Sequence, residues 1–191
     1  MTYGFYFDAN KCIGCATCEV ACKEKWDQKP GVAFRNVRTF EFGAFPVASI
    51  YHFSGSCNHC EKPLCVANCP QGAMYVAEEG TVQHNDAKCI GCGACVEACP
   101  YDAPKLLSVT KKAGKCNACT ERRAEGLLPS CVEACHMRCL DFGESSILVE
   151  KYGSNLTFDL PFLPPPSETN PRSLVRPVVD SQAKDIIEKQ L

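Results

Sequence analysis

Residues 88–99 read KCIGCGACVEAC, and residues 11–22 read KCIGCATCEVAC, so one short unit is used twice in the chain. Both copies space their cysteines as C-x2-C-x2-C-x3-C. Two further groups of four cysteines, with wider spacing, lie between and after the copies. In chain order the four groups are Cys12, Cys15, Cys18 and Cys22; Cys57, Cys60, Cys65 and Cys69; Cys89, Cys92, Cys95 and Cys99; and Cys116, Cys119, Cys131 and Cys135. Of the 17 cysteines, only Cys139 lies outside a group.

So many cysteines in 191 residues indicate either a disulfide framework or a metal protein. The opening residues MTYGFYFD lack the basic and apolar regions of a secretory signal, so we expect no signal peptide and a compartment where thiols stay reduced. No apolar run approaches the roughly 18 residues of a membrane helix. A net charge of −2 provides no broad basic surface for nucleic acid. The sequence therefore predicts a soluble metal protein with no nucleic-acid partner and no direct membrane insertion.

The spacing of the repeated unit is the ligand pattern of bacterial ferredoxins. Three cysteines two residues apart can hold three corners of a cubane, and small residues such as Gly14 and Gly91 let backbone amides approach its sulfurs. In two-cluster ferredoxins the fourth cysteine binds the neighbouring cluster. Zinc usually takes two separated cysteine pairs or histidine, and the fourth group read alone could be a zinc ribbon. Zinc and disulfides stay as alternatives, but four groups together favour iron–sulfur clusters.

The pattern of apolar and polar residues predicts an α+β chain of short elements. We predict strands at residues 3–7, 34–42, 47–53, 74–77 and 81–84, and helices at residues 16–26, 94–99, 120–125 and 131–135. Six of the 13 prolines lie beyond Lys151, so residues 151–191 should run extended and add little core. This tail is expected to lie along a partner subunit or, alternatively, to pack on the chain's own domain or be disordered. Residues 180–191 could form a short amphipathic helix.

Five stretches then occur in a recognisable order: CIGCATCEVAC, SCNHCEKPLCVANCPQGAM, CIGCGACVEACPYDAP, KCNACTERRAEGLLPSCVEAC and LDFG. Together they resemble the four-cluster electron-transfer subunits of molybdopterin oxidoreductases, in particular the family of dimethyl sulfoxide reductase iron–sulfur subunits. The likeness covers residues 3–143. It implies two nested ferredoxin-like domains, one formed by residues 1–50 and 110–150 and the other by residues 51–109, followed by a proline-rich tail at 151–191 that contacts a partner.

The resemblance also implies which cysteines share a cluster. Set one would be Cys12, Cys15, Cys18 and Cys135; set two Cys116, Cys119, Cys131 and Cys22; set three Cys57, Cys60, Cys65 and Cys99; and set four Cys89, Cys92, Cys95 and Cys69. Every position keeps cysteine, so four 4Fe–4S clusters are expected. Some relatives replace one cysteine of the third group and carry a 3Fe–4S cluster, and Cys92 argues against that here.

The function implied by the resemblance is electron transfer without catalysis, so no catalytic residue is expected. The partners would be a large molybdopterin-containing catalytic subunit and, where one exists, a membrane quinone-reactive subunit, as in anaerobic respiration. The protein would be a peripheral membrane-associated subunit, either exported with its partner or cytoplasmic. The alternatives are an electron-transfer subunit of a hydrogenase or formate–hydrogen complex and a free polyferredoxin.

A few residues near the ligands leave two interpretations open. His136 stands where a proline commonly follows the last cysteine, and it could donate to a sulfur or be a histidine of no special role. Cys139 could replace a lost ligand or be a small buried apolar residue. Lysines precede the first cysteine of three groups, where they could tune a potential or be solvated charges: Lys11, Lys88 and Lys115.

Overall fold

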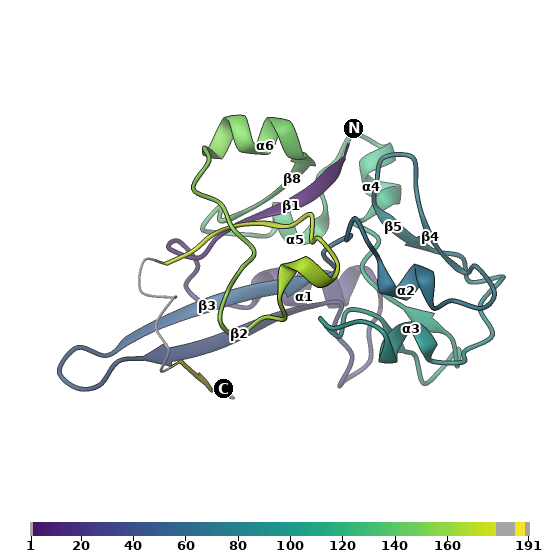
Figure 1. The fold of residues 1–191 in the computed structure, drawn as a ribbon, viewed down its shortest axis with the longest axis horizontal. Coiled ribbons are helices and arrows are strands. Elements are labelled where there is room, and N and C mark those ends of the chain that lie inside the picture. The colour runs from purple at the N-terminus through teal and green to yellow at the C-terminus, as the bar shows by residue number, and fades with distance from the viewer. Residues whose placement is uncertain (1, 179–185, 190–191) are drawn as a thin grey trace.

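Short strands and short helices alternate along the chain, and in its described part the strands form four small sheets (Figure 1). The computed structural model describes residues 2–178 and 186–189. The α+β class predicted from the sequence is confirmed at this level. None of the described helices combines the length and the apolar character needed to cross a bilayer.

The N-terminal strand joins distant parts of the chain. β1 (Tyr3–Asp8) is the middle strand of a sheet in which β8 (Leu140–Glu144) pairs antiparallel and β9 (Leu174–Arg176) pairs parallel. Phe5 and the ring of Tyr6 point to opposite faces, because successive side chains alternate along a strand. Both are buried, and the Tyr6 ring stacks on Tyr152 with centroids 3.6 Å apart. Burial on both faces explains the nearly continuous aromatic run of this strand.

A long hairpin projects from the rest of the molecule (Figure 1). It consists of β2 (Arg35–Phe42) and β3 (Ser49–Ser56), which confirms the two strands predicted there. A third strand, β10 (Ile187–Lys189), pairs antiparallel with β2. The prediction of a helix at residues 180–191 is therefore wrong for Ile187–Lys189, because the exposed edge of β2 offers these residues backbone partners. Residues 180–185, 190 and 191 lie outside the described part of the chain.

Two pairs of short helices each bring two cysteine groups together, and five cysteines lie on the helices themselves: Cys18, Cys22, Cys65, Cys95 and Cys131. α1 (Thr17–Lys25) packs against α5 (Ser130–Glu133), and α2 (Leu64–Ala67) packs against α3 (Ala94–Glu97). The first pair thus brings together cysteine groups one and four, and the second pair brings together groups two and three. The helices predicted at the places of α1, α3 and α5 are confirmed, with slightly shifted ends, whereas α2 was not predicted.

Smaller elements connect these helix pairs. The predicted hairpin is confirmed as β4 (Met74–Val76) and β5 (Val82–His84), which lie near α2 and α3 (Figure 1). The sequence did not predict the two-residue strands β6 (Lys105–Leu106) and β7 (Ala113–Gly114). α4 (Thr120–Ala124) was predicted, whereas α6 (Ser145–Tyr152) was not.

The described part of the tail packs on the chain's own surface, which is one of the alternatives that the sequence left open. Phe158, Leu160 and Val175 are buried in the main core. The ring of Phe162 lies 4.1 Å from that of Phe40 on the hairpin. Residues 161–165 run without regular structure up to a 3-10 turn at Pro166–Glu168. The expectation that the tail adds little core is therefore wrong, because apolar residues before and between its prolines are buried.

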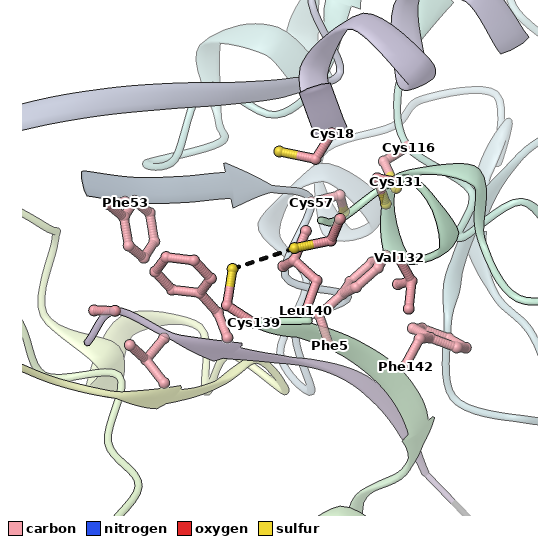
Figure 2. Packing of buried hydrophobic residues seen from close by; sticks show 14 of the residues in the cluster. Phe5, Cys18, Phe53, Cys57, Cys116, Cys131, Val132, Cys139, Leu140 and Phe142 are labelled. Carbon is pink, nitrogen blue, oxygen red and sulfur yellow. Dashed lines mark hydrogen bonds between the residues drawn. The ribbon is translucent and has the colours of Figure 1, made fainter. Parts of the chain in front are cut away.

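The core is built largely around sulfur. The main cluster of buried residues combines aromatic side chains of β1, β2 and β3 with the thiols of seven cysteines (Figure 2). These seven are Cys18, Cys22, Cys57, Cys116, Cys131, Cys135 and Cys139. A smaller cluster around Met74 and Val82 contains Cys65 and Cys95. Many of the predicted ligands are thus interior residues, and the fold converges on them.

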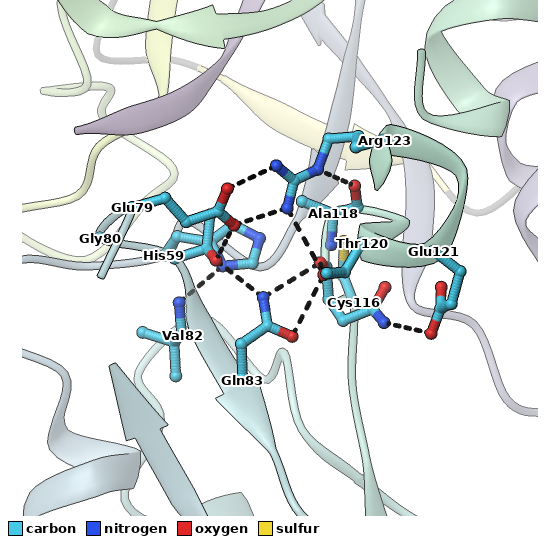
Figure 3. Close-up of polar contacts among 12 residues, drawn as sticks. His59, Glu79, Gly80, Val82, Gln83, Cys116, Ala118, Thr120, Glu121 and Arg123 are labelled. Carbon is cyan, nitrogen blue, oxygen red and sulfur yellow. Dashed lines mark hydrogen bonds and ion pairs between the residues drawn. The ribbon is translucent and has the colours of Figure 1, made fainter. Parts of the chain in front are cut away.

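An ion pair fastens the β4–β5 hairpin to α4 (Figure 3). Arg123 donates to both carboxylate oxygens of Glu79, at 2.7 and 2.6 Å, and Thr81 donates to the same carboxylate at 2.6 Å. The backbone amide of Tyr3 also donates to the carbonyl of Glu79. Glu79 thereby joins the segment of groups two and three to the segments of groups one and four.

Replacing Glu79 by glutamine is expected to lower the melting temperature by about 2–4 °C, the shift that corresponds to about 1 kcal/mol in a chain of this size. The hydrogen bonds from Arg123 hold the pKa of Glu79 below its usual value. A lowered pKa in the folded state adds stability above the unfolded-state pKa, and this stability is lost as the pH falls through the folded-state pKa. The variant should therefore lose less stability than the wild type on acidification below about pH 4.5. Glu78→Gln, at an exposed neighbour, is the control; equal melting curves for all three proteins would contradict the prediction.

Candidate functional site

Three of the four predicted ligand sets each surround a single hollow. The thiols of set four line one hollow together with Met74 and His84. Those of set three line another beside Lys115 and Thr169. Those of set one line a third, where Cys139 is a fifth thiol. In each case four cysteines from distant stretches of the sequence face the same space.

The thiols of set two are gathered in the interior of the protein. Cys22, Cys116, Cys119 and Cys131 are all buried. Burial raises the pKa of Cys22 to about 12, and the neighbouring sulfurs of Cys131 and Cys119 contribute to the rise. Figure 2 shows Cys116 and Cys131 next to each other, with Cys18 of set one and Cys57 of set three both to their left in this view. Set two is the only set in which every thiol is buried.

The loops that carry the cysteines depend on left-handed backbone. Gly14 and Gly91 hold the same place in the repeat and have φ values of 69° and 71°. A Cβ on Gly91 would lie 2.0 Å from the carbonyl oxygen of Lys111, and one on Gly14 would lie 2.5 Å from the ring of His52. Glycine is therefore required at both positions by the backbone conformation and by the closeness of a second segment. The sequence indicated a small residue here only for access of amides to sulfur.

Backbone amides point at ligand sulfurs after the end of α2. The amide of Ala73 donates to Cys69 Sγ at 3.2 Å. Burial alone would raise the pKa of Cys69, but the amides of residues 71–74 outweigh it and lower the pKa. Such amides stabilise negative charge on sulfur, and in iron–sulfur proteins they help to set the reduction potential.

Several of the other thiols are held in their neutral form in the absence of a metal. Burial raises the pKa of Cys60 to about 11 and that of Cys65 to about 12. Since a metal ligand must be a thiolate, a bound cation has to displace these protons. Set three, to which both thiols belong, is therefore suited to a strongly bound metal group rather than to free reactive thiolates.

The donor sets fit a metal cluster in their chemistry. Their donors are sulfur atoms, which iron–sulfur clusters use. In the described part of the chain, no three Cys, His, Asp or Glu side chains are close enough together to hold a single metal ion. The thiols surround hollows instead. His84 lines the hollow of set four, and its buried Nε2 has no hydrogen-bond partner among the described residues.

Successive sets lie next to one another. Cys18 of set one is close enough to Cys131 of set two for their charges to interact. Cys116 of set two is likewise close enough to Cys57 of set three for their charges to interact. Cys65 of set three and Cys95 of set four belong to one packed cluster. The four sets therefore form a series from one to four.

Solvent exposure differs along this series. Cys15 of set one and Cys92 of set four are the two exposed cysteines among the described residues. Ile13 and Ile90, which precede Gly14 and Gly91 in the repeat, are 58% and 64% exposed. The first and last sets thus reach the surface beside exposed apolar side chains, whereas set two does not.

The remaining sequence candidates differ in their surroundings. Cys139 is 3% exposed and its sulfur lies 3.3 Å from that of Cys135, as the dashed line from Cys139 in Figure 2 marks. His136 is exposed. His59 is wholly buried, where its Nδ1 accepts from the amide of Val82 (Figure 3) and burial depresses its pKa, so it is a neutral structural residue.

Two cations beside the thiols are buried, which the sequence did not indicate. Lys115 is 5% exposed and Arg35 is 2% exposed. Burial alone would lower the pKa of Arg35, but the thiols around it, including Cys131 and Cys18, outweigh this and raise it. Lys11 and Lys88, which precede cysteines in the same way as Lys115, are exposed. Of the three lysines that precede a first cysteine, only Lys115 therefore places its charge beside buried thiols.

Comparisons with known proteins agree with this arrangement. Residues 48–145 match the family described as a 4Fe-4S dicluster domain, and residues 3–24 match a 4Fe-4S binding domain. The chain is 40% identical over 188 residues to the iron–sulfur subunit of anaerobic dimethyl sulfoxide reductase from Escherichia coli (strain K12), an alignment covering 94% of this chain and 91% of that protein. It is 41% identical over 159 residues to a subunit of sulfite dehydrogenase from Allochromatium vinosum, covering 72% and 66%. It is 40% identical over 137 residues to a subunit of tetrathionate reductase from Salmonella typhimurium, covering 70% and 54%.

Proposed function

Because this protein is a member of the 4Fe-4S dicluster family, together with the iron–sulfur subunit of anaerobic dimethyl sulfoxide reductase, we propose that it relays electrons through four 4Fe–4S clusters within an oxidoreductase complex. It would connect a large molybdopterin-containing catalytic subunit with a membrane quinone subunit or another carrier. The observation that carries this proposal is the convergence of the predicted thiols, three sets of which each line one hollow. When bound, the clusters supply one-electron reduction and oxidation.

The residues proposed to hold the clusters are the sixteen cysteines of the four sets. The helix α1 contributes ligands to two different sets, because Cys18 belongs to set one and Cys22 to set two. The same exchange is proposed for Cys69 and Cys99, which end groups two and three and complete each other's set. Such crossed ligands support two nested ferredoxin-like domains, with residues 51–109 inserted between 1–50 and 110–150.

The exposure of the sets supports transfer from one end of the series to the other. Electrons would enter or leave at sets one and four, where Cys15 and Cys92 are exposed. Sets two and three would act as the interior steps. The exposed side chains of Ile13 and Ile90 offer apolar contact area to redox partners at these two places. The tail at 151–191 is proposed to contact a partner as well, through the face that does not pack on this chain.

The proposal is tested by purifying the protein anaerobically from its native source with whatever binds to it. About sixteen iron atoms and as many acid-labile sulfides per chain are expected from four cubanes. A colourless, folded, iron-free chain or a zinc-only chain would refute it. A large pterin-containing partner supports the proposed complex, whereas a hydrogenase partner or a stable monomer would support the alternatives.

Replacing Cys92 by serine is expected to convert one cubane into a 3Fe–4S cluster, because the exposed corner of set four loses its thiolate. Iron should fall by about one atom in about sixteen, and a 3Fe–4S signal should appear in the electron paramagnetic resonance (EPR) spectrum of the oxidised protein. Cys139→Ala is the matched control, since Cys139 is the one cysteine outside the four sets, and it should retain all the iron. An unchanged spectrum with full iron content in Cys92→Ser would disprove the set-four assignment.

A further inference from the structure

Lys115 lies where set two meets set three. Its ammonium donates to the backbone carbonyls of Val82, on β5, and of Cys116, the latter at 2.7 Å. The same nitrogen lies 3.6 Å from Cys57 Sγ. Lys115 therefore contacts one thiol-bearing residue of each set, from the two segments that are proposed to be separate ferredoxin-like domains.

Arg35 lies where set one meets set two. Its guanidinium donates to the carbonyl and the hydroxyl of Ser54, both at 3.0 Å, and to the hydroxyl of Ser56 at 2.9 Å. The hydroxyl of Ser54 is in turn 3.2 Å from Cys18 Sγ. The guanidinium carbon lies 4.7 Å from the ring centre of Phe5. The Nε of Arg35 is buried and has no hydrogen-bond partner among the described residues.

Among the described residues, neither cation has a carboxylate partner. In the described part of the chain, the hydrogen-bond acceptors of Lys115 and Arg35 are carbonyls, hydroxyls and one sulfur. Burying a charge without a counter-charge is strongly unfavourable. The negative charge available nearby is that of the cysteine sulfurs, which become thiolates when they bind metal.

We propose that Lys115 and Arg35 are positioning residues whose buried charges raise the reduction potentials of the clusters beside them, Lys115 at sets two and three and Arg35 at sets one and two. This inference rests on the proposed function. Adding an electron to a buried, already negative group is disfavoured by the loss of solvation. A fixed positive charge at close range in a low-dielectric interior offsets that penalty. The two cations thus keep the buried middle of the series accessible to an electron.

The test replaces Lys115 by methionine, which nearly keeps the length of the side chain and removes its charge. Lys88→Met is the matched control, because Lys88 also precedes the first cysteine of its group but is exposed. The complete native complex is used, iron is counted first, and the potentials are then measured by EPR-monitored redox titration. At a fixed poise, the ratio of reduced to oxidised signal of set two or three should fall about tenfold in Lys115→Met, equivalent to about 59 mV for one electron. It should not change in Lys88→Met.

The results separate an effect of the Lys115 charge on the potentials from a purely structural role of Lys115. Full iron content with unchanged potentials in Lys115→Met would overturn the proposal while leaving the clusters established. If Lys115→Met does not assemble, Lys115→Gln, which removes the charge, is compared with Lys115→Arg, which keeps it. If Lys115→Arg assembles with wild-type potentials and Lys115→Gln does not assemble, the role of charge is supported. It is also supported if Lys115→Gln assembles with lowered potentials. Failure of both, or a Gln variant with wild-type potentials, assigns Lys115 to structure alone. An iron-free wild type would refute the proposed function itself.

The same design applies to Arg35. Arg35→Met should lower the potential of set one or two, and Arg38→Met on the same strand is its control, because Arg38 pairs with Glu188 at the exposed edge. If Arg35→Met fails to assemble, Arg35→Lys keeps the charge and should restore both iron and potentials. Loaded Arg35→Met with wild-type potentials, or failure of Arg35→Lys as well, would limit Arg35 to its hydrogen bonds with Ser54 and Ser56.

Discussion

Electron transfer between the first and last cysteine sets is expected to fall to background when Cys22 is replaced by alanine. Cys22 is buried on α1, close to Cys131 and Cys119, and it is proposed as the fourth ligand of set two. Cys92 lies at an exposed corner, but Cys22 is buried, and alanine there leaves neither a ligand atom nor access for a solvent ligand. The variant should therefore lose the whole cluster of set two, about four of about sixteen iron atoms. Because set two adjoins both set one and set three, no other set can replace it as a step in the series.

The measurement is the rate of reduction of set four after a donor delivers electrons at set one, followed by freeze-quench EPR. Val20→Ala is the control, because Val20 lies on the same helix but is 62% exposed, and its rate should equal that of the wild type. An unchanged rate in Cys22→Ala with lost iron would mean that electrons bypass set two, and the linear order of the sets would have to be abandoned.

Complete removal of iron is expected to unfold the chain at room temperature. Nine thiols, eight of proposed ligands and that of Cys139, belong to the two buried clusters of residues, so the core is organised around sulfur. Without metal these hollows lose the group that fills them, and metal binding free energy in such small domains is folding free energy. Because the net stability of a domain of this kind is only roughly 5–15 kcal/mol, the loss of this contribution is expected to unfold the chain.

This expectation is measured by far-ultraviolet circular dichroism and hydrogen exchange before and after anaerobic chelation. Iron should also leave more readily as the pH falls, since burial raises the pKa of Cys22 and of Cys65 to about 12 and protons therefore compete for these sulfurs. A metal-free chain that keeps its spectrum and melts cooperatively would show that the aromatic core around β1 is sufficient by itself.

The parts of the fold that sequence could predict are those where local pattern and ligand spacing coincide. The helices that carry Cys18, Cys95 and Cys131 were predicted because their ligand spacing coincides with good helix formers, whereas the short helix of Cys65, in a group of wider spacing, was missed. The alternation in β2 and β3 also signalled strands. The tail was misjudged because its prolines dominate the local signal, whereas the burial of Phe158 and the pairing of β9 with β1 depend on residues distant in the sequence.

The candidate site also has features that the sequence predicts and features that depend on tertiary structure. The sixteen cysteines were evident from spacing, and the crossed sets came from the likeness to a family. The buried state of Lys115 was not evident, since Lys88 also stands directly before the first cysteine of its group and is exposed. What separates them is tertiary: Val82 and Cys57 provide acceptors for Lys115, and both come from another segment of the chain. Arg35 is likewise defined by Ser54 on the neighbouring strand.

The position of β1 has a consequence for how the protein is made. Its sheet partners, at 140–144 and 174–176, leave the ribosome long after it does. Sets three and four, by contrast, lie wholly within residues 57–99. A nascent polypeptide can therefore receive its inner pair of cofactors first, while Cys12 waits for Cys135 to be synthesised. Maturation would proceed from the middle of the sequence outward, and the N-terminal strand would close the structure last.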